Sequence, residues 1–337
     1  MPSAKIGKQT IAFQAPPVII GHAAAAGQKE GAGPIGNSFD QLSSDSYWGE
    51  ATWEKAESVM QKTVLALAAD KAGIPPSAVE FLFAGDLLNQ CIGSSFGHRD
   101  SGLPFFGLFG ACSTMGEAMI LAAMTIGGGF AQATAAVTSS HFCTAERQFR
   151  FPLEYGGQRT PTSQWTVTGA GAAILAASGA GPQVTHVTPG KIVDAGIKDP
   201  NNMGAAMAPA AYTTLKQHFE DTGRTPGDYD LIVTGDLGSL GHAVVKDLFK
   251  KDGVALQTYQ DCGLMIYDRE RQKVDAGGSG CGCAAGVLNG YLLNAMRDGR
   301  WSRILFCPTG ALMSTTSAGQ GESIPGICHA LAISTVG

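Results

Sequence analysis

Charged residues are scarce in this chain. Only 15% of its 337 residues are Asp, Glu, Lys or Arg, and the formal net charge is −5. No long run of Lys and Arg is present, which argues against a nucleic-acid partner. Hydrophobic residues make up 44% of the sequence, so we expect a folded chain with a large buried core.

Long apolar runs are also missing. The run at 17–20 is too short for the hydrophobic region of a signal peptide. The best membrane candidate, 115–130, contains Glu117 and a break of three glycines. We therefore expect neither a signal peptide nor a transmembrane helix. The eight cysteines then suggest reduced thiols, and their spacing does not match a zinc site, so we predict no metal and no cofactor.

Two segments of the chain repeat each other. Residues 63–87 align without a gap to residues 213–237, and each copy reads as a helix, a Gly/Pro turn and an apolar strand that ends in Gly-Asp-Leu. Asp86 and Asp236 thus end equivalent strands. Two weaker repeats follow in the same order, one around a Gly-flanked cysteine and one in a Gly-containing apolar strand. Three repeats in one order indicate an internal duplication.

Each half alternates strands with helices, which predicts an α/β fold. We place an N-terminal half at 1–180 and a C-terminal half at 181–337, and we expect them to pack as one body. An insert at 142–166 carries Arg147, Arg150 and Arg159 and is expected to cap a pocket or a partner surface. Strands are predicted near 17–22, 80–86, 132–139, 167–177, 183–189, 229–235, 263–268, 302–308 and 327–335. Helices are predicted near 53–72, 113–127, 208–221, 241–251 and 281–297.

The stretch Phe-Gly-Ala-Cys-Ser-Thr at 109–114 places Cys112 at the start of an apolar helix. Ser113 or Thr114 can cap that helix, with Glu117 as the acidic half of a capping box. Free amides and the helix dipole would favour a nucleophilic thiolate. The same amides could hold a carboxylate ligand, and Cys112 could equally be a small buried apolar residue. The segment by itself leaves these alternatives open.

Taken together, these motifs resemble the thiolase-like superfamily, and within it β-ketoacyl-acyl carrier protein synthase III. The segment Thr-Gly-Ala-Gly-Ala-Ala at 168–173 is similar to that family's glycine-rich strand, and 309–311 to its terminal hairpin. The resemblance covers essentially the whole chain. It implies a five-layer αβαβα fold built from two duplicated halves.

The motifs at 18–21, 109–114 and 277–283 resemble most a sporulation branch of this superfamily. This resemblance implies a protein that binds dipicolinic acid (pyridine-2,6-dicarboxylate), as such or as its calcium chelate. It implies a role in uptake of that compound into the developing spore and in its release during germination. The implied partners are SpoVA membrane proteins, through which the chain would sit on the forespore membrane. A homodimer formed through the strand at 132–139 is the expected assembly.

In synthase III the cysteine works with a His and an Asn. The cysteine corresponds to Cys112, but the place of the His holds Asp236, and the place of the Asn falls in the turn 277–280, which has no amide side chain. The resemblance therefore implies a binding protein without condensation chemistry. An acyltransferase that uses Cys112 with a relocated His242 is the alternative, and a structural scaffold with an unused pocket is a third.

Two segments are predicted to meet the ligand's carboxylates. Amides near Cys112 and Ser113 would hold one, and the turn at 278–280 the other. Asp261 is a candidate pocket residue that could complete a calcium shell, although it could equally be a turn residue. The full set of predicted ligand-binding residues is Cys112, Ser113, Asp236, His242, Asp261, Gly278 and Ser279.

Overall fold

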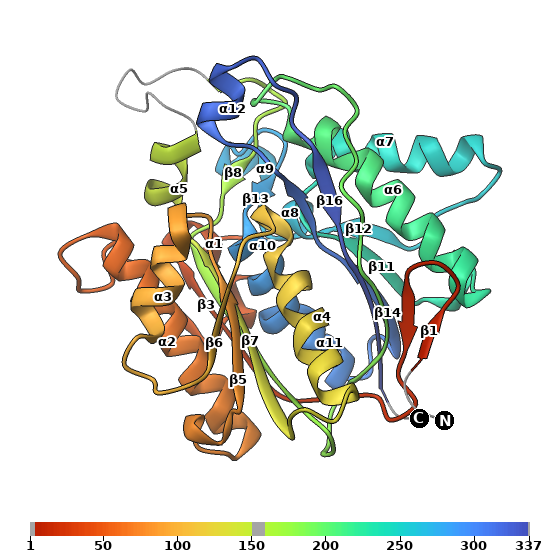
Figure 1. Ribbon diagram of the computed structural model, residues 1–337. Helices are drawn as coiled ribbons and strands as arrows, with labels where there is room; N and C mark the ends of the chain where they lie inside the picture. The colour runs from red at the N-terminus through yellow and green to blue at the C-terminus, as the bar shows by residue number, and fades with distance from the viewer. Residues whose placement is uncertain (1–3, 150–158, 336–337) are drawn as a thin grey trace.

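The protein is described by a computed structural model, which covers residues 4–149 and 159–335 (Figure 1). Arg150 of the predicted insert lies outside the described residues. One large mixed sheet runs through the molecule, with the strand order β12-β11-β14-β17-β10-β3-β9-β7-β5-β6. Its C-terminal strands are β12 (Tyr259–Asp261), β11 (Leu231–Thr234), β14 (Arg303–Cys307), β17 (Ala330–Ser334) and β10 (Gln183–Thr188). Its N-terminal strands are β3 (Val18–Gly27), β9 (Gly169–Ala176), β7 (Ala133–Ser140), β5 (Phe81–Gly85) and β6 (Phe105–Leu108).

The strand order reflects the repeat in the sequence. The repeated Gly-Asp-Leu segments follow β5 and β11, and each of these strands is second from its end of the sheet. The two sets of strands meet where β10 pairs antiparallel with β3 at Gln183 and Val18. Short strands complete the fold: β1 (Ala4–Ile6), β2 (Thr10–Ala12), β4 (Gln41–Ser43), the pair β8 (Trp165–Thr166) and β13 (Gly278–Ser279), and the pair β15 (Thr309–Ala311) and β16 (Gly326–Cys328).

Helices form three layers around the two sets of strands (Figure 1). The central layer contains α4 (Thr114–Gly127), α10 (Cys281–Gly286) and α11 (Leu293–Arg297), the last two joined by a π-helical turn at Val287–Leu292. In the main core, Met115 and Met119 of α4 pack with Phe83 of β5 and Phe306 of β14. Outer helices bury the other faces: α2 (Trp53–Ala72) on the N-terminal strands, and α6 (Met203–Thr222) and α7 (Gly238–Lys251) on the C-terminal strands. This is the thiolase-like α/β fold.

The repeated helices α2 and α6 end alike. Each ends at a glycine in the left-handed conformation, Gly73 with φ +69° and Gly223 with φ +66°, which a residue with a side chain rarely adopts. At their starts, Thr52 caps α2 by accepting from the amide of Lys55, and Asn202 caps α6 in the same way. The helix predicted at 53–72 is confirmed.

The structure differs from the expectations at three places. The apolar run predicted as a strand at 263–268 begins as the helix α8 (Cys262–Met265), because an apolar run of this length does not distinguish a strand from a buried helical turn. The edge strand β6 was not predicted. Subunits cannot pair through 132–139, because β7 already lies between β9 and β5. The remaining helices are α1 (Gln28–Gly31), α3 (Ile92–His98), α5 (Phe142–Phe149), α9 (Arg269–Gln272) and α12 (Thr315–Gly319).

Among the helices that the structure describes, none is both long and apolar enough to cross a membrane.

Candidate functional site

Cys112 lies in a 3-10 turn, Ala111–Ser113, that leads directly into α4. The Ser113 hydroxyl donates to the carbonyl of Gly110 at 2.7 Å, and the Thr114 hydroxyl donates to the carbonyl of Ala111 at 2.5 Å. Neither hydroxyl caps the helix, so the predicted capping box is wrong. The turn uses both hydroxyls to hold its own carbonyls, and Ala111 takes a positive φ of 50° in doing so.

The Cys112 thiol lines a small cavity and is itself only 6% exposed. The cavity volume is ≈ 30 Å³, which is room for about two water molecules. Most of the wall is apolar, and none of the described residues that line it is Lys, Arg or His. The lining residues are Leu87, Phe109, Ala111, Cys112, Ala145, Phe149, Thr166, Met203, Ser279, Ala311 and Met313.

Asp236 lies behind the polar wall of this cavity and is fully buried. One of its carboxyl oxygens accepts from the Ser279 hydroxyl at 3.1 Å and from the Gly280 amide at 3.0 Å. The other accepts from the Thr309 hydroxyl at 2.9 Å. The Ser279 hydroxyl is also 3.9 Å from the Cys112 sulfur, so a polar chain runs from the thiol to the carboxyl group.

The surroundings of Cys112 disfavour its thiolate. Burial raises the pKa of Cys112 well above its ordinary value, and the neighbouring Asp236 carboxyl raises it further. Burial also raises the pKa of Asp236, against the lowering effect of its hydrogen bonds. The expectation of an activated thiolate is therefore wrong: burial and a nearby carboxyl outweigh the helix N-terminus.

Two of the amides predicted to hold a ligand, those of Ser113 and Gly280, already have partners. The Ser113 amide donates to the Gly110 carbonyl at 3.1 Å, and the Gly280 amide is bound by Asp236. The Gly278 carbonyl accepts from the Gln164 side chain at 3.3 Å. Of the predicted ligand-binding residues, Cys112 and Ser279 line the cavity, and Asp236 is hydrogen-bonded to Ser279 without lining it. The Ser113 side chain instead bonds the Gly110 carbonyl within the same turn.

Asp261 and His242 lie at the outer end of the C-terminal strands. Asp261 is fully buried and accepts from the Thr234 hydroxyl at 2.7 Å and from the amides of Leu237 and Gly238, so it holds the start of α7. Burial raises its pKa to about 7. The His242 ring stacks on Tyr259 with centroids 4.3 Å apart, and its Nε2 lies 3.3 Å from the Tyr259 carbonyl. No hydrogen bond in the described chain joins His242 to Cys112.

Several residues of the cavity wall were not predicted from the sequence. Ala145 and Phe149 of α5 and Thr166 of β8 close one side of the cavity, and all three fall in or at the end of the predicted insert. The described part of that insert therefore caps a pocket, as expected. Isolated residues such as these do not belong to a recognisable sequence motif, and only the position of the predicted insert indicated them.

The duplicated α/β sheet and the cysteine at the start of its central helix define a thiolase-like protein. Solved structures of this class superpose on the chain at low sequence identity. They include 3-oxoacyl-[acyl-carrier-protein] synthase III from Aquifex aeolicus (13% identity, TM-score 0.57, 94% of this chain and 99% of that chain). Acat5 thiolase from Ascaris suum superposes with 12% identity and a TM-score of 0.59, over 95% of this chain and all of that chain. At these identities the likeness concerns the fold alone.

The family is narrower than the fold class. The family model of stage V sporulation protein AD (SpoVAD) matches residues 7–334. Over 332 residues the chain is 44% identical to stage V sporulation protein AD of Bacillus subtilis (strain 168), a match that covers 98% of each chain. The chain belongs to the SpoVAD family, and is thus a sporulation protein with a thiolase-like fold.

Proposed function

We propose that this chain binds dipicolinic acid without catalysis and serves its uptake into the developing spore. The observation that carries the proposal is the buried thiol of Cys112, linked through the Ser279 hydroxyl to the Asp236 carboxyl group; burial and this carboxyl group raise the pKa of the thiol. A thiol nucleophile needs a base or a nearby cation to become reactive, and a carboxyl group acts in the opposite direction. A cavity with a cysteine that is not activated is better suited to binding than to acyl transfer.

The donor set favours the calcium chelate of the ligand over the free dianion. The polar wall offers the hydroxyls of Ser279 and Thr166, with the Asp236 carboxyl behind them and no cationic side chain among the described residues of the lining. A free dianion would face Asp236 uncompensated. Calcium bound to the ligand offsets that charge and accepts further oxygen ligands, which hydroxyl and carboxylate groups supply.

The cavity must widen before a ring with two carboxylates can enter. Phe149 of α5 and Met313, which follows β15, bound the cavity from the described parts of two different segments. Both side chains are flexible about their χ angles, and displacement of either enlarges the space next to Cys112 without moving the sheet. We therefore expect binding to be accompanied by movement of α5.

Calorimetric titration of dipicolinate, with and without calcium, tests the proposal. Saturable heat is expected with calcium and a smaller heat without it, and Ser279→Ala should weaken binding at least several-fold. Cys143→Ala, a half-buried cysteine of α5 that does not line the cavity, is the matched control and should bind as wild type does. No heat with millimolar ligand in either condition would overturn the proposal and favour a scaffold role.

The alternative, an acyltransferase that uses Cys112, has its own test. Incubation with an acyl-coenzyme A thioester followed by intact-protein mass spectrometry would detect an acyl adduct on the thiol. We expect no adduct at neutral pH. An adduct that disappears in Cys112→Ser would establish the transferase and overturn the non-catalytic proposal.

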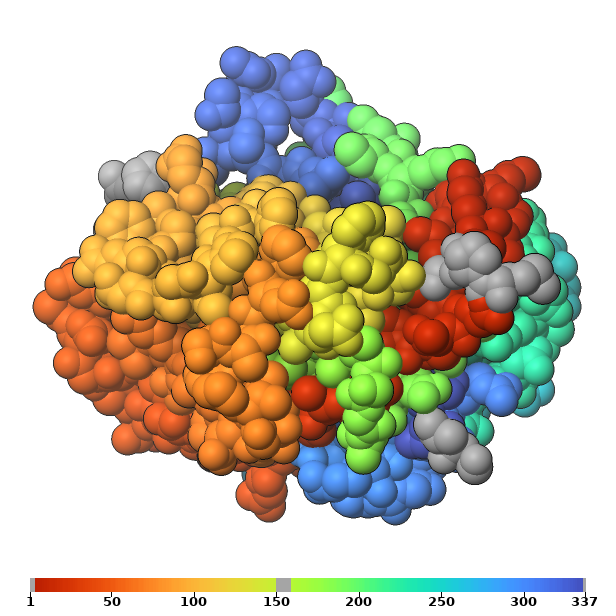
Figure 2. Space-filling model, turned by 60° about the horizontal axis from the view of Figure 1, so that its bottom comes forward, coloured from red at the N-terminus to blue at the C-terminus, as the bar shows by residue number. Residues whose placement is uncertain are grey.

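We further propose that the chain reaches the forespore membrane through SpoVA membrane proteins and forms a homodimer through β6. This strand pairs with β5 alone among the described strands, and Phe105 is 37% exposed on it. An exposed apolar edge strand is a ready surface for pairing with a second copy. Phe105→Glu should yield a monomer near 34.7 kDa in light scattering. The end of α4 (yellow) lies on the face that Figure 2 shows. Phe130→Glu, at a 75% exposed residue between α4 and β7 and outside the described strands, should leave the dimer intact.

A further inference from the structure

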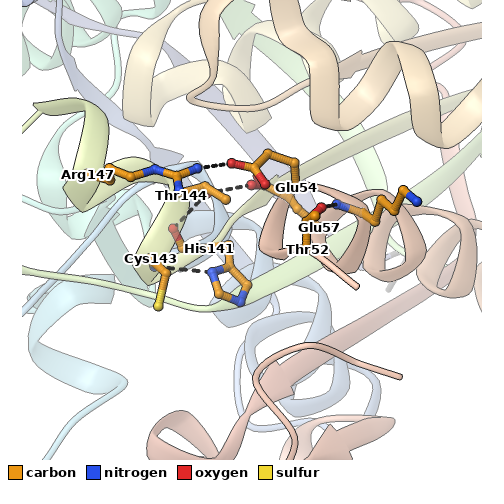
Figure 3. A network of polar contacts seen from close by, with 8 residues as sticks. Thr52, Glu54, Glu57, His141, Cys143, Thr144 and Arg147 are labelled. Atoms are coloured by element: carbon orange, nitrogen blue, oxygen red, sulfur yellow. Dashed lines mark hydrogen bonds and ion pairs between the residues drawn. The ribbon is translucent and has the colours of Figure 1, made fainter. Parts of the chain in front are cut away.

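The helix α5 (Phe142–Phe149) covers the Cys112 cavity with one face and contacts α2 with the other (Figure 3). Ala145 and Phe149 line the cavity. On the opposite face, the Thr144 hydroxyl lies 2.9 Å from a carboxyl oxygen of Glu57, and Arg147 pairs with Glu54 nearer the surface. The position of α5, and with it the size of the cavity, thus depends on two glutamates of α2.

Glu57 is fully buried and lies beside a second buried carboxyl group, Asp86. Both pack against Gly93: a Cβ built there would lie 3.2 Å from Asp86 Cγ and 3.3 Å from Glu57 Cγ. The second oxygen of Glu57 accepts from the Ser139 hydroxyl at 2.9 Å. Two carboxyl groups this close cannot both be charged in a buried site without a compensating cation.

The titratable groups around this pair supply no such cation. Arg147 is engaged with Glu54, and within the described residues neither Glu57 nor Asp86 takes part in an ion pair. Burial lowers the pKa of His98 to about 4, so this ring is neutral near pH 7. The groups that face the pair from the elements around it are Glu54, Cys91, His98, His141, Arg147 and Cys281.

The hydrogen bonds around Thr144 accommodate a proton on Glu57. The Thr144 hydroxyl has one hydrogen but two oxygens in reach, Glu57 at 2.9 Å and the His141 carbonyl at 3.0 Å. If Glu57 is neutral, it donates to Thr144, which then donates to His141. If Glu57 is charged, Thr144 shares its one hydrogen between the two oxygens. Burial and the Asp86 charge favour the neutral form, since they raise the pKa of Glu57 to about 8.

We propose that Glu57, beside Asp86, is a proton-operated latch on α5, which keeps the Cys112 cavity closed while Glu57 holds its proton. Loss of that proton to solvent leaves two buried carboxylates that repel each other, and it breaks the relay from Glu57 through Thr144 to the His141 carbonyl. The face of α5 that contacts α2 then separates, and Phe149 withdraws from the cavity. This inference rests on the proposed function only in one respect, the identity of the ligand that enters the opened cavity.

Hydrogen exchange of the α5 amides in the full chain, without ligand, tests the latch. Protection factors are corrected for the intrinsic pH dependence of exchange, so a pH-dependent factor reports a proton linked to opening. We expect protection to fall by up to tenfold per pH unit, the limit for one linked proton, between pH 4.5, the ordinary pKa of a glutamate, and about pH 8, the raised pKa of Glu57. Above about pH 8 both states have lost the proton, so protection should level off. Amides of α4 should show no such fall.

Matched variants distinguish the latch from general loosening of the helix pair. Glu57→Gln keeps an NH₂ group to donate to Thr144 and a carbonyl to accept from Ser139, so protection of α5 should become independent of pH. Glu54→Gln removes the neighbouring ion pair with Arg147, and should lower protection by a similar factor at every pH while keeping the fall. Asp86→Asn should also make α5 protection less dependent on pH, and this variant replaces Glu57→Gln in the test if Glu57→Gln does not fold.

Two results would overturn the latch. One is flat α5 protection in the wild type between about pH 5 and about pH 8, and the other is a fall that persists in a folded Glu57→Gln or Asp86→Asn variant. Because no ligand is present in this experiment, its outcome is independent of the titration with dipicolinate. If α5 protection depends on pH as expected but titration with dipicolinate gives no heat, the proposed function alone is refuted. If the titration gives heat but α5 protection does not depend on pH, the latch alone is refuted.

Discussion

The substitution Asp236→Asn should activate the thiol of Cys112. The Asp236 carboxyl group raises the pKa of Cys112 through its charge, on top of the effect of burial. Asparagine removes the charge and can keep the local bonds: its carbonyl accepts from the Gly280 amide, and its NH₂ group donates to the Thr309 hydroxyl, which can turn to accept. The change is therefore electrostatic rather than steric.

A neighbouring charge shifts a pKa by about 1–3 units at such distances. The fraction of Cys112 present as thiolate at a given pH should thus rise about 10- to 1,000-fold in Asp236→Asn, since each pKa unit is a factor of ten. The assay is the rate of iodoacetamide modification at pH 9, resolved by peptide mass spectrometry. Cys143, which is half-buried and outside the cavity, serves as the internal reference in the same sample.

Ser279→Ala supplies a control with the opposite sign. The Ser279 hydroxyl lowers the pKa of Cys112, so its removal should slow alkylation of Cys112 relative to Cys143. If Asp236→Asn and Ser279→Ala changed the ratio in the same direction, the change would reflect access to the cavity. That result, or an unchanged ratio of Cys112 to Cys143 alkylation in Asp236→Asn, would refute the conclusion that the Asp236 charge suppresses the ionisation of Cys112.

Two further predictions concern buried carboxyl groups away from the cavity. Tyr267→Phe removes a hydrogen-bond donor from buried Glu30 and should lower the free energy of unfolding, measured by urea titration, by about 1–3 kcal/mol. The control is Tyr212→Phe, which removes an exposed hydrogen bond to Asp252 and should lower the free energy of unfolding much less. Equal losses in the two variants would contradict this reasoning. For Asp261, the folded pKa of about 7 lies above the ordinary 3.8, so its protonation stabilises the fold fully below pH 3.8 and this contribution is lost as the pH rises through 7. Across that pH window the free energy of unfolding of the wild type should therefore fall by up to about 1.4 kcal/mol per pH unit relative to that of Asp261→Asn. If the free energies of unfolding of the two proteins changed in parallel with pH, the pKa assigned to Asp261 would be wrong.

The sequence was informative where the chain repeats itself. The match of 63–87 to 213–237 placed α2 and α6, the strands that follow them, and Asp86 and Asp236 at equivalent strand ends. The glycine-rich turn before α10 placed Ser279 opposite the start of α4. These signals survive in the sequence because turns with positive φ, such as Gly280 at +101°, restrict the residues that can occupy them.

The sequence was uninformative where the answer depends on partners from elsewhere in the chain. Whether the Gly280 amide is free depends on Asp236, and whether Cys112 ionises depends on burial and on that same carboxyl group. The role of α5 as a cover for the cavity depends on Glu57, which lies 87 residues from Thr144 in the sequence. None of these relations leaves a local pattern in the residues concerned.

The duplication also accounts for how a carboxyl group comes to face the thiol. In the N-terminal half, Asp86 accepts from the Leu88 amide at 2.8 Å and the Ser94 amide at 2.7 Å, and so fixes the chain where it leaves β5. In the C-terminal half, Asp236 binds instead the turn before α10, through the Gly280 amide at 3.0 Å. An aspartate at this strand end is thus a structural element in both halves. In the second half the turn that it holds forms the polar wall of the cavity, so the residue that fixes this wall is also the one that suppresses the ionisation of Cys112.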